Sequence, residues 1–308
     1  MNILHVDVDK NLIPLLSAGR TRSFTLRPGT VQRISKKQSV SCITCKSQSI
    51  LTAEVLASFP SLKLIVARTV GTDNIDLKYC KAHGIAVYHI PNYGSQVVAE
   101  HALALTLAGA RHIVQANREV HTGKFSYEPF FGMAIGGKTV GVVGTGKIGR
   151  AFIKLISAFG VKILAYDVFK NQKVAGDLGF QYLSLPKLLK SADIVSIHVP
   201  LLAKTKHLIG AKEFEIMKEG SILVNTSRGA IIDTNALLSR ISKFWAVCMD
   251  VVEDEDKFTK YNPLVGYKNV IITPHVGFYT DQSIKRIVQE TERCIMNYIK
   301  GTQEGKIV

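Results

Sequence analysis

The sequence lacks long hydrophobic stretches. No apolar run approaches the roughly 20 residues that cross a bilayer. The first residues also lack the apolar stretch of an export signal, because Asp7 and Asp9 stand there. We therefore expect neither a membrane span nor export, and we expect the protein to stay in the cytoplasm.

Cysteine is scarce, with five residues in a chain of 308. An odd number of cysteines without an export signal favours reduced thiols over a disulfide framework. Cys42 and Cys45 have the C-x-x-C spacing of redox and half-zinc motifs. They lie in a β-prone run, where residues three apart point to opposite faces, and no second cysteine pair follows. We expect both to pack in a core, and we expect no metal site.

Acidic residues are few compared with basic ones, 24 against 39, which gives a net charge of +15. Such an excess suits nucleic acid, a membrane surface or anionic metabolites. The basic residues are spread along the chain, and no nucleic-acid-binding motif accompanies them. We therefore expect neither a nucleic-acid nor a membrane partner, and the source of the charge stays open.

Strand-like and helix-like segments alternate along the chain, which favours an α/β architecture of two domains with parallel sheets. A long apolar helix is expected at 97–111, an irregular arm at 121–137 and a last helix at 280–298. The expected strands of the first series are 3–8, 39–44, 63–67 and 85–89, and the second series contains 138–144, 162–167, 193–198, 221–227, 246–251 and 269–275. Near-continuous apolar strands of this kind belong to parallel sheets covered on both faces.

Gly144, Gly146 and Gly149 form G-x-G-x-x-G between an expected strand and an amphipathic helix. Glycine suits these places because the chain must turn sharply, let a pyrophosphate approach the backbone, and pack the helix on the strand. The next strand ends at Asp167, whose carboxylate can accept hydrogen bonds from the ribose hydroxyls and would repel a 2′-phosphate. The order of these features predicts an NAD site rather than an NADP site.

Three further segments carry the side chains that reduction of a 2-keto acid needs. A cation must hold the carboxylate, an acid must protonate the carbonyl oxygen, and a third group must keep that acid charged. Arg228, Glu255 and His275 supply these types, each at or just beyond the carboxyl end of an expected strand. In open parallel sheets ligands bind at that edge.

Other residues compete for these roles. His198 also ends a strand and is an alternative acid, whereas His101 reads as a helix residue with a hydrogen-bond partner. Glu253 and Asp254 stand beside Glu255, so the sequence alone leaves open which of these acids is the histidine's partner.

At these residues the sequence resembles the D-isomer-specific 2-hydroxyacid dehydrogenase family over nearly the whole chain. The motifs are the glycine fingerprint, then NTSRGAIID, DVxExE and TPH in that order. The resemblance implies that Arg228 binds the substrate carboxylate and polarises the carbonyl, that His275 donates the proton, and that Glu255 holds His275 in its charged form. It also implies two Rossmann-like or flavodoxin-like domains: a discontinuous substrate domain of 1–94 and 279–308, and an NAD-binding domain of 95–278. The helix after Tyr93 and the arm would form a homodimer contact.

The resemblance assigns further residues one by one. The amides of Val70 and Gly71 would meet the substrate carboxylate, with Tyr93 and Phe278 beside the same substrate. The positions that match cofactor contacts are Gly144, Gly146, Lys147, Ile148, Gly149, Asp167, Val199, Pro200, Thr205, Thr226, Ser227 and Asp250. Lys147 replaces the His or Arg more often found there.

Two segments, RTVGTDNID and HVGFYTDQSI, resemble the D-lactate dehydrogenase branch, in which Phe278 would close over a methyl group. The expected substrate is therefore pyruvate or a similar small 2-keto acid. Lys46 falls about where phosphoglycerate dehydrogenases place an arginine for the substrate phosphate, but we interpret it as a solvated surface lysine. The alternatives are a hydroxypyruvate or glyoxylate reductase, a D-3-phosphoglycerate dehydrogenase, and an NAD-sensing binding protein of the corepressor type.

Overall fold

The computed structural model describes residues 1–8, 20–21, 34, 36–91 and 93–308. Asp9 lies outside the described residues. The described chain divides into two compact units, Met1–Tyr93 with Tyr279–Val308, and Gly94–Phe278. The sequence had placed residue 94 in the first of them.

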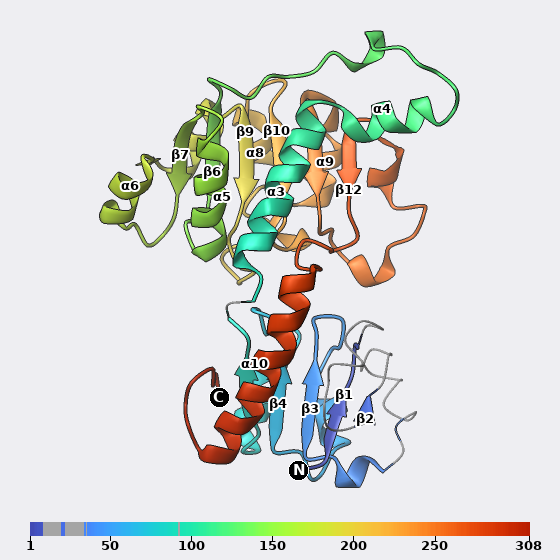
Figure 1. Ribbon diagram of the computed structural model, residues 1–308, viewed down its shortest axis with the longest axis vertical. Helices are drawn as coiled ribbons and strands as arrows, with labels where there is room; N and C mark the ends of the chain where they lie inside the picture. The colour runs from blue at the N-terminus through green and yellow to red at the C-terminus, as the bar shows by residue number, and fades with distance from the viewer. Residues whose placement is uncertain (9–19, 22–33, 35, 92) are drawn as a thin grey trace. The chain divides into compact units, whose positions relative to one another are not determined.

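The first unit contains a five-stranded parallel sheet with the strand order β2-β1-β3-β4-β5 (Figure 1). Its strands are β1 (Ile3–His5), β2 (Arg20–Thr21), β3 (Cys42–Cys45), β4 (Leu64–Ala67) and β5 (Ala86–His89). The order reverses between β1 and β3, so this is the flavodoxin-like arrangement, whose switch point lies between those two strands. Leu4 of β1 pairs with Ile43 of β3, which defines the register of the two strands.

Within the described residues, three α-helices belong to this sheet: α1 (Ala53–Ala57), α2 (Leu77–Ala82) and α10 (Asp281–Lys300). Polar side chains start all three, because Thr52, Asp76 and Thr280 each accept a hydrogen bond from an amide of the first turn. Helix α10 ends at Gly301, whose φ of 71° is the left-handed conformation that glycine adopts without strain. Buried residues from α1, α2 and the strands form one core.

Cys42 and Cys45 are both completely buried in β3, which confirms the expectation that they pack in the core. Burial raises the pKa of each thiol to about 12. They are therefore protonated at neutral pH and poor as metal ligands or nucleophiles.

The second unit contains a seven-stranded parallel sheet with the order β12-β11-β10-β9-β6-β7-β8. Its strands are β6 (Thr139–Val143), β7 (Lys162–Tyr166), β8 (Gln181–Tyr182), β9 (Ile194–Ile197), β10 (Ile222–Asn225), β11 (Ala246–Met249) and β12 (Val270–Ile272). The order is that of a dinucleotide-binding fold extended by one strand, and it reverses between β6 and β9.

Helices cover both faces of this sheet. In Figure 1 helices α3 (Ser95–Ala110) and α5 (Lys147–Ser157) lie in front of the sheet. The remaining helices of the unit are α4 (Ile113–Val120), α6 (Gln172–Leu178), α7 (Leu185–Ser191), α8 (Ala211–Ile216) and α9 (Thr234–Leu238). Neighbouring side chains of β6 lie in two different hydrophobic cores. Val142 is in the same core as Phe152 of α5, and Val143 is in the same core as Leu188 of α7. This alternation explains why the strands are apolar on both sides.

Among the described residues no single helix is long and apolar enough to cross a membrane. Helix α3 together with the segment Ile113–His121 meets the length and composition test as a pair bent by 64°. The inner face of α3 is buried against α5, β10 and β11, the position of a core helix.

The α/β class with two parallel sheets is confirmed. Among the described strands and α-helices, three elements were not predicted: β2 and β8, which have two residues each, and α4. A two-residue strand is too short to show alternation. Helix α4 does have apolar residues at helix spacing, Ile113, Ala116 and Val120, but it has only eight residues and none of them is buried.

Candidate active site

The glycine turn has the geometry that a dinucleotide needs. Gly144 has a φ of 100°, and a Cβ there would lie 2.7 Å from the carbonyl oxygen of His198. A Cβ on Gly149 would overlap the carbonyl oxygen of Gly144. Gly146, at the amino end of α5, has open space where its Cβ would be. The first and third glycines are therefore required by the fold, whereas the second leaves room for a ligand.

Asp167, which follows β7, is fixed to this turn. Its Oδ2 accepts hydrogen bonds from the amide (2.6 Å) and hydroxyl (2.9 Å) of Thr145, and its Oδ1 accepts one from the amide of Phe169 at 3.0 Å. A carboxylate has about four lone-pair positions, so Oδ1 can accept one more hydrogen bond, such as one from a ribose hydroxyl. Val168 and Phe169 are 74% and 85% exposed beside it. The sequence reasoning missed this apolar pair, which the exposure of two large side chains reveals.

A buried polar group without a partner follows β10. The hydroxyl of Thr226 is buried and has no hydrogen-bond partner in the described part of the chain, so it suits a contact with a polar ligand atom. Next to it Ser227 is occupied, because its hydroxyl donates to the carbonyl of Ile197 at 2.8 Å. Thr205 is also occupied: its hydroxyl accepts from the amide of Leu202 (2.7 Å) and donates to the carbonyl of Pro200 (2.6 Å). The residues present therefore fit a dinucleotide.

The remaining cofactor positions are described by burial. Gly149 is buried, Ile148 packs partly into the core of α3 and α5, Lys147 is exposed in the first turn of α5, Val199 is half-buried and Pro200 is exposed. Their contacts with a cofactor stay predictions.

His275 and Glu255 form a pair. His275 Nδ1 lies 2.8 Å from Glu255 Oε1, and the side chains are 24% and 41% exposed. Since a carboxylate only accepts hydrogen bonds, the proton lies on Nδ1 in this contact and Nε2 is left to act on a substrate. The histidine's φ is 54°, and its amide donates to the carbonyl of Asp250 at 2.8 Å. This uncommon left-handed backbone sets the direction of the ring.

The competing acids have other partners. Glu253 accepts from His207 Nε2 at 2.7 Å and from the amide of Thr234 at 3.0 Å. Asp254 pairs with Lys257 at 3.3 Å and is exposed. The geometry therefore joins Glu255, and neither of its acidic neighbours, to His275.

Asp250 holds the turn that carries the histidine. Its buried carboxylate accepts from the hydroxyl of Thr273 (2.6 Å) and from the amides of Val276 (2.9 Å) and Gly277 (2.8 Å), with His101 Nε2 at 3.3 Å. Burial would raise the pKa of Asp250, but the hydrogen bonds, first that from His101, lower it below its ordinary value. Asp250 thus anchors the turn that carries His275, and its contact with the cofactor stays a prediction. His101 has the hydrogen-bond partner that was expected of it.

His198 is unsuited to donate a proton. Burial lowers its pKa to about 3, and its ring packs 5.1 Å from that of Phe152. One ring nitrogen is bonded to the Ser196 hydroxyl at 2.9 Å. A histidine that is neutral at every physiological pH does not supply an acidic proton.

Arg228 lies between two anchored segments. Its carbonyl accepts from the side chain of Asn225 at 2.9 Å, and its Nη1 donates to the carbonyl of Ser227 at 2.9 Å. A Cβ on the next residue, Gly229, would overlap the carbonyl of Val252. The close backbone approach that this glycine permits joins the segment of Arg228 to the one that leads to Glu255.

The predicted substrate residues Val70, Gly71 and Tyr93 belong to the first unit. Val70 is 44% exposed, and its carbonyl accepts from His89 Nδ1 at 2.8 Å. Within the described residues neither amide of Val70 and Gly71 takes part in a hydrogen bond. Two free amides after a strand are suitable donors for a carboxylate.

The interpretation of Lys46 as a solvated surface lysine is wrong. It follows β3 and is only 5% exposed, with Nζ 5.9 Å from the ring centre of Tyr279. Its amide donates to Asp7 Oδ2 at 3.1 Å, and its carbonyl accepts from Asn74 at 2.9 Å. A lysine stem buries well along apolar surface, which the sequence pattern does not reveal.

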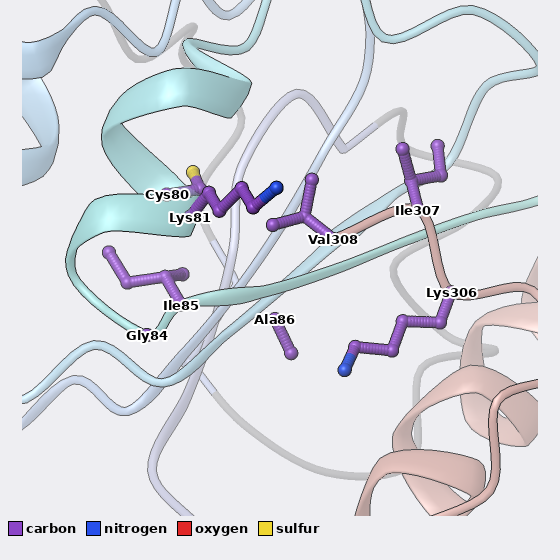
Figure 2. A pocket seen from close by; sticks show the side chains of 8 residues that line it. All are labelled: Cys80, Lys81, Gly84, Ile85, Ala86, Lys306, Ile307 and Val308. Carbon is purple, nitrogen blue, oxygen red and sulfur yellow. The ribbon is translucent and has the colours of Figure 1, made fainter.

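A surface pocket of about 360 Å³ lies elsewhere in the first unit (Figure 2). It is lined by Cys80, Lys81, Gly84, Ile85, Ala86, Lys306, Ile307 and Val308. It lies where β5 begins, whereas Val70 and Gly71 follow the end of β4, so in a parallel sheet they occupy opposite edges. None of the predicted site residues lines this pocket.

Comparisons with known proteins agree with this geometry. The family model described as D-isomer specific 2-hydroxyacid dehydrogenase, NAD binding domain, matches residues 103–277. The glyoxylate reductase of Thermococcus litoralis is 37% identical over 257 residues, which are 80% of this chain and 77% of that protein. The D-3-phosphoglycerate dehydrogenase of Archaeoglobus fulgidus is 38% identical over 261 residues, which are 84% of this chain but 49% of that protein, so the chain spans about half its length.

A solved structure, the D-lactate dehydrogenase of Aquifex aeolicus with NAD and lactic acid, is 34% identical. The match has a TM-score of 0.89 and covers 99% of this chain and 97% of the Aquifex aeolicus chain. The match of the family model to more than half of the chain, together with these relatives, shows that the chain belongs to the D-isomer specific 2-hydroxyacid dehydrogenase family and is an NAD-dependent oxidoreductase.

Proposed function

We propose that the chain reduces pyruvate, or a 2-keto acid of similar size, to the corresponding D-2-hydroxy acid. The observation that carries this choice is Phe278. Its ring stands edge-on to that of His275, with 6.2 Å between ring centres and 86° between planes. An apolar ring beside the proton donor suits a small apolar substituent on the keto carbon better than a charged one.

The chemistry divides among three side chains. NAD in its reduced form supplies the hydride. Arg228 holds the substrate carboxylate with its planar guanidinium and draws electron density from the carbonyl. His275, with Nδ1 held by Glu255, presents Nε2 and donates its proton to the carbonyl oxygen. Glu255 stabilises the imidazolium that must be present before the proton is transferred.

The test is NADH oxidation with pyruvate, 2-ketobutyrate, phenylpyruvate, glyoxylate, hydroxypyruvate and 3-phosphohydroxypyruvate, followed by chiral analysis of the product. We expect the highest kcat/KM with pyruvate or 2-ketobutyrate, and a D product. A preference for glyoxylate or for the phosphorylated acid would refute the choice of substrate. Inactivity on all six with intact NADH binding would instead favour an NAD-sensing binding protein.

A second candidate has an observation of its own. The buried Lys46 is a cation at the switch point of the first sheet, where ligands bind in such folds, and Asp7 adjoins it. The ammonium group of this lysine would contact the second anionic group of a phosphorylated keto acid. Lys46→Met separates the two candidates, because it should leave pyruvate reduction within about threefold yet abolish any activity on the phosphorylated acid.

The assembly is proposed to be a homodimer. Helix α4 and the arm carry six large apolar side chains that are at least 46% exposed: Ile113, Val114, Val120, Phe125, Tyr127 and Phe131. An apolar cluster of this kind is typical of a protein interface.

A further inference from the structure

Three consecutive strands of the second sheet end in loops that carry the proposed site residues. The β9 loop, 198–210, contains Val199, Pro200 and Thr205; the β10 loop, 226–234, contains Thr226, Ser227 and Arg228; the β11 loop, 250–255, contains Asp250 and Glu255. Cofactor binding and proton transfer therefore depend on how these loops are held relative to one another.

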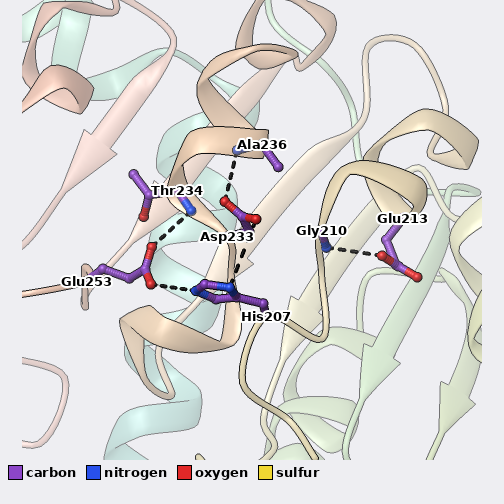
Figure 3. Close-up of polar contacts among 7 residues, drawn as sticks. All are labelled: His207, Gly210, Glu213, Asp233, Thr234, Ala236 and Glu253. Atoms are coloured by element: carbon purple, nitrogen blue, oxygen red, sulfur yellow. Dashed lines mark hydrogen bonds and ion pairs between the residues drawn. The ribbon is translucent and has the colours of Figure 1, made fainter.

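His207 links the β9 loop to both of the others (Figure 3). Its Nε2 lies 2.7 Å from Glu253 Oε1 in the β11 loop, and its Nδ1 lies 4.0 Å from Asp233 Oδ2 in the β10 loop. Its amide donates to the carbonyl of Ala230 at 2.8 Å. His207 has a φ of 52°, so a left-handed backbone turns the imidazole toward these loops.

Glu253 completes the link. Its second oxygen, Oε2, accepts from the amide of Thr234 at 3.0 Å, where α9 begins. Burial would raise the pKa of Glu253, but hydrogen bonds from Thr234 and His207 lower it below its ordinary value, so the carboxylate is charged. One ionised group thus holds a donor from each of the two neighbouring loops, with one hydrogen bond to each of its oxygens.

Backbone contacts around the link also join the loops to one another. Ile209 and Ile232 form a parallel bridge between the β9 and β10 loops, and Gly229 packs directly on the carbonyl of Val252. Beyond His207, Gly210 is fixed by Glu213, whose Oε2 accepts from its amide at 3.1 Å (Figure 3). The His207–Glu253 contact is the polar centre of this three-loop layer.

We propose that His207 and Glu253 are positioning residues of the reductase: together they set the β9 loop, which meets the cofactor, against the segments that carry Arg228 and Glu255. This inference rests on the roles given to Arg228 and Glu255 above. Isolated surface ion pairs contribute little to stability, but a misplacement of about 1 Å in a catalytic group can lower a rate about 100-fold. The pair should therefore affect turnover more than folding.

Paired substitutions of His207 separate its two contacts. Asparagine tolerates the left-handed backbone, but its amide takes the place of Nδ1 and does not reach Glu253. Glutamine places a donor where Nε2 stood. We expect His207→Asn to raise the Kd for NADH and lower kcat/KM, each about tenfold, and His207→Gln to stay within about threefold of the wild type. His83→Asn, at an exposed histidine after α2, is the matched control.

A double-mutant cycle with Glu253→Ala tests the coupling. We expect His207→Asn in the Glu253→Ala background to cause no further loss, because the shared contact is already gone. Additive losses would overturn the proposal. So would a lower Tm with unchanged NADH Kd and kcat/KM per folded molecule, since the pair would then be only a stabilising contact.

Glu253→Gln keeps an acceptor for Thr234 and replaces Glu253→Ala in the cycle if the alanine variant does not fold. NADH Kd is measured by fluorescence titration without substrate, and kcat/KM is measured on whichever keto acid the wild type reduces best. The outcome of the cycle therefore does not depend on which keto acid is the substrate. A failure of the proposed function and a failure of this inference can be told apart.

Discussion

At the scale of the residue, environment separates two histidines that the sequence places in the same kind of position. His198 follows β9 and His275 follows β12, both at the carboxyl edge of the sheet. His198 is 8% exposed and has a hydroxyl for a neighbour, whereas His275 is bonded to a carboxylate. Only a histidine whose charged form is stabilised can serve as the acid of the reduction.

Burial of a neutral His198 should make folding sensitive to acid. Its pKa is lowered from 6.5 to about 3, so below 6.5 the unfolded chain binds a proton that the folded chain does not. Stability is therefore fully present above pH 6.5 and is lost as the pH falls, by about 1.4 kcal/mol per pH unit. From pH 6.5 to about 5, the free energy of unfolding should fall about 2 kcal/mol more in the wild type than in His198→Gln.

Urea unfolding at the two pH values measures this difference, and all other titrating groups cancel in the comparison. His83→Gln, at an exposed histidine, should keep the acid sensitivity of the wild type. Equal losses in His198→Gln and the wild type would show that His198 is protonated in the folded protein.

The contact between Glu255 and His275 predicts an effect on turnover. Glu255→Gln removes the carboxylate that accepts from Nδ1 of His275 but keeps the shape, so kcat/KM for reduction should fall at least about tenfold while the Kd for NADH stays within about twofold of the wild type. The measurement is the initial rate of NADH oxidation at a fixed pH, together with a fluorescence titration of NADH.

Asp254→Asn is the matched control, because it neutralises the adjacent carboxylate, which pairs with exposed Lys257 at 3.3 Å. Asparagine also tolerates the φ of 50° at this position. A loss of kcat/KM in this control, with none in Glu255→Gln, would contradict the pairing.

How far the sequence reaches differs from residue to residue. Arg228, Glu255 and His275 can be found because each follows a strand that ends at the same edge of the sheet. The residue pattern alone left Glu253 open and the family resemblance favoured Glu255; the contact of Glu255 with His275 depends on a 3₁₀ turn, Glu255–Lys257, that no periodicity reveals. The burial of Lys46 was missed because the side-chain stem, which the sequence cannot place, decides it.

At the scale of the element, the turn between β6 and α5 separates glycines that the fold requires from the one that the cofactor requires. Gly146→Ala places its Cβ in open space, so Tm should stay within about 2 °C of the wild type while the Kd for NADH rises at least about tenfold. Gly149→Ala collides with the carbonyl of Gly144, so it should lower Tm as well.

Thermal unfolding with and without NADH, together with fluorescence titration, measures both effects. Gly176→Ala, in α6, is the control, because its Cβ also meets nothing within 4 Å. Unchanged NADH affinity in Gly146→Ala would mean that the pyrophosphate does not approach this backbone.

The strands could be predicted wherever four or five mostly apolar residues follow one another, as in β6 and β9. Helix α4 was missed although Ile113, Ala116 and Val120 recur at helix spacing, and its exposed Ile113, Val114 and Val120 face no core of their own chain. The exposure of apolar residues on this helix is explained if a second molecule covers them.

At the scale of the whole molecule, the exposed aromatic side chains of the arm predict that the chain forms a homodimer. Phe125, Tyr127 and Phe131 are 94%, 87% and 82% exposed, an arrangement that costs free energy in water unless a partner covers it. The wild type should sediment as a dimer of the 33.8 kDa chain, and the triple variant with serine at these three positions should sediment as a monomer that still binds NADH. Serine at Tyr261, Val265 and Ile299, which are 81%, 50% and 58% exposed outside the arm, should leave the dimer intact. A wild type that is monomeric at micromolar concentration, or an arm variant that stays dimeric, would remove the arm from the interface.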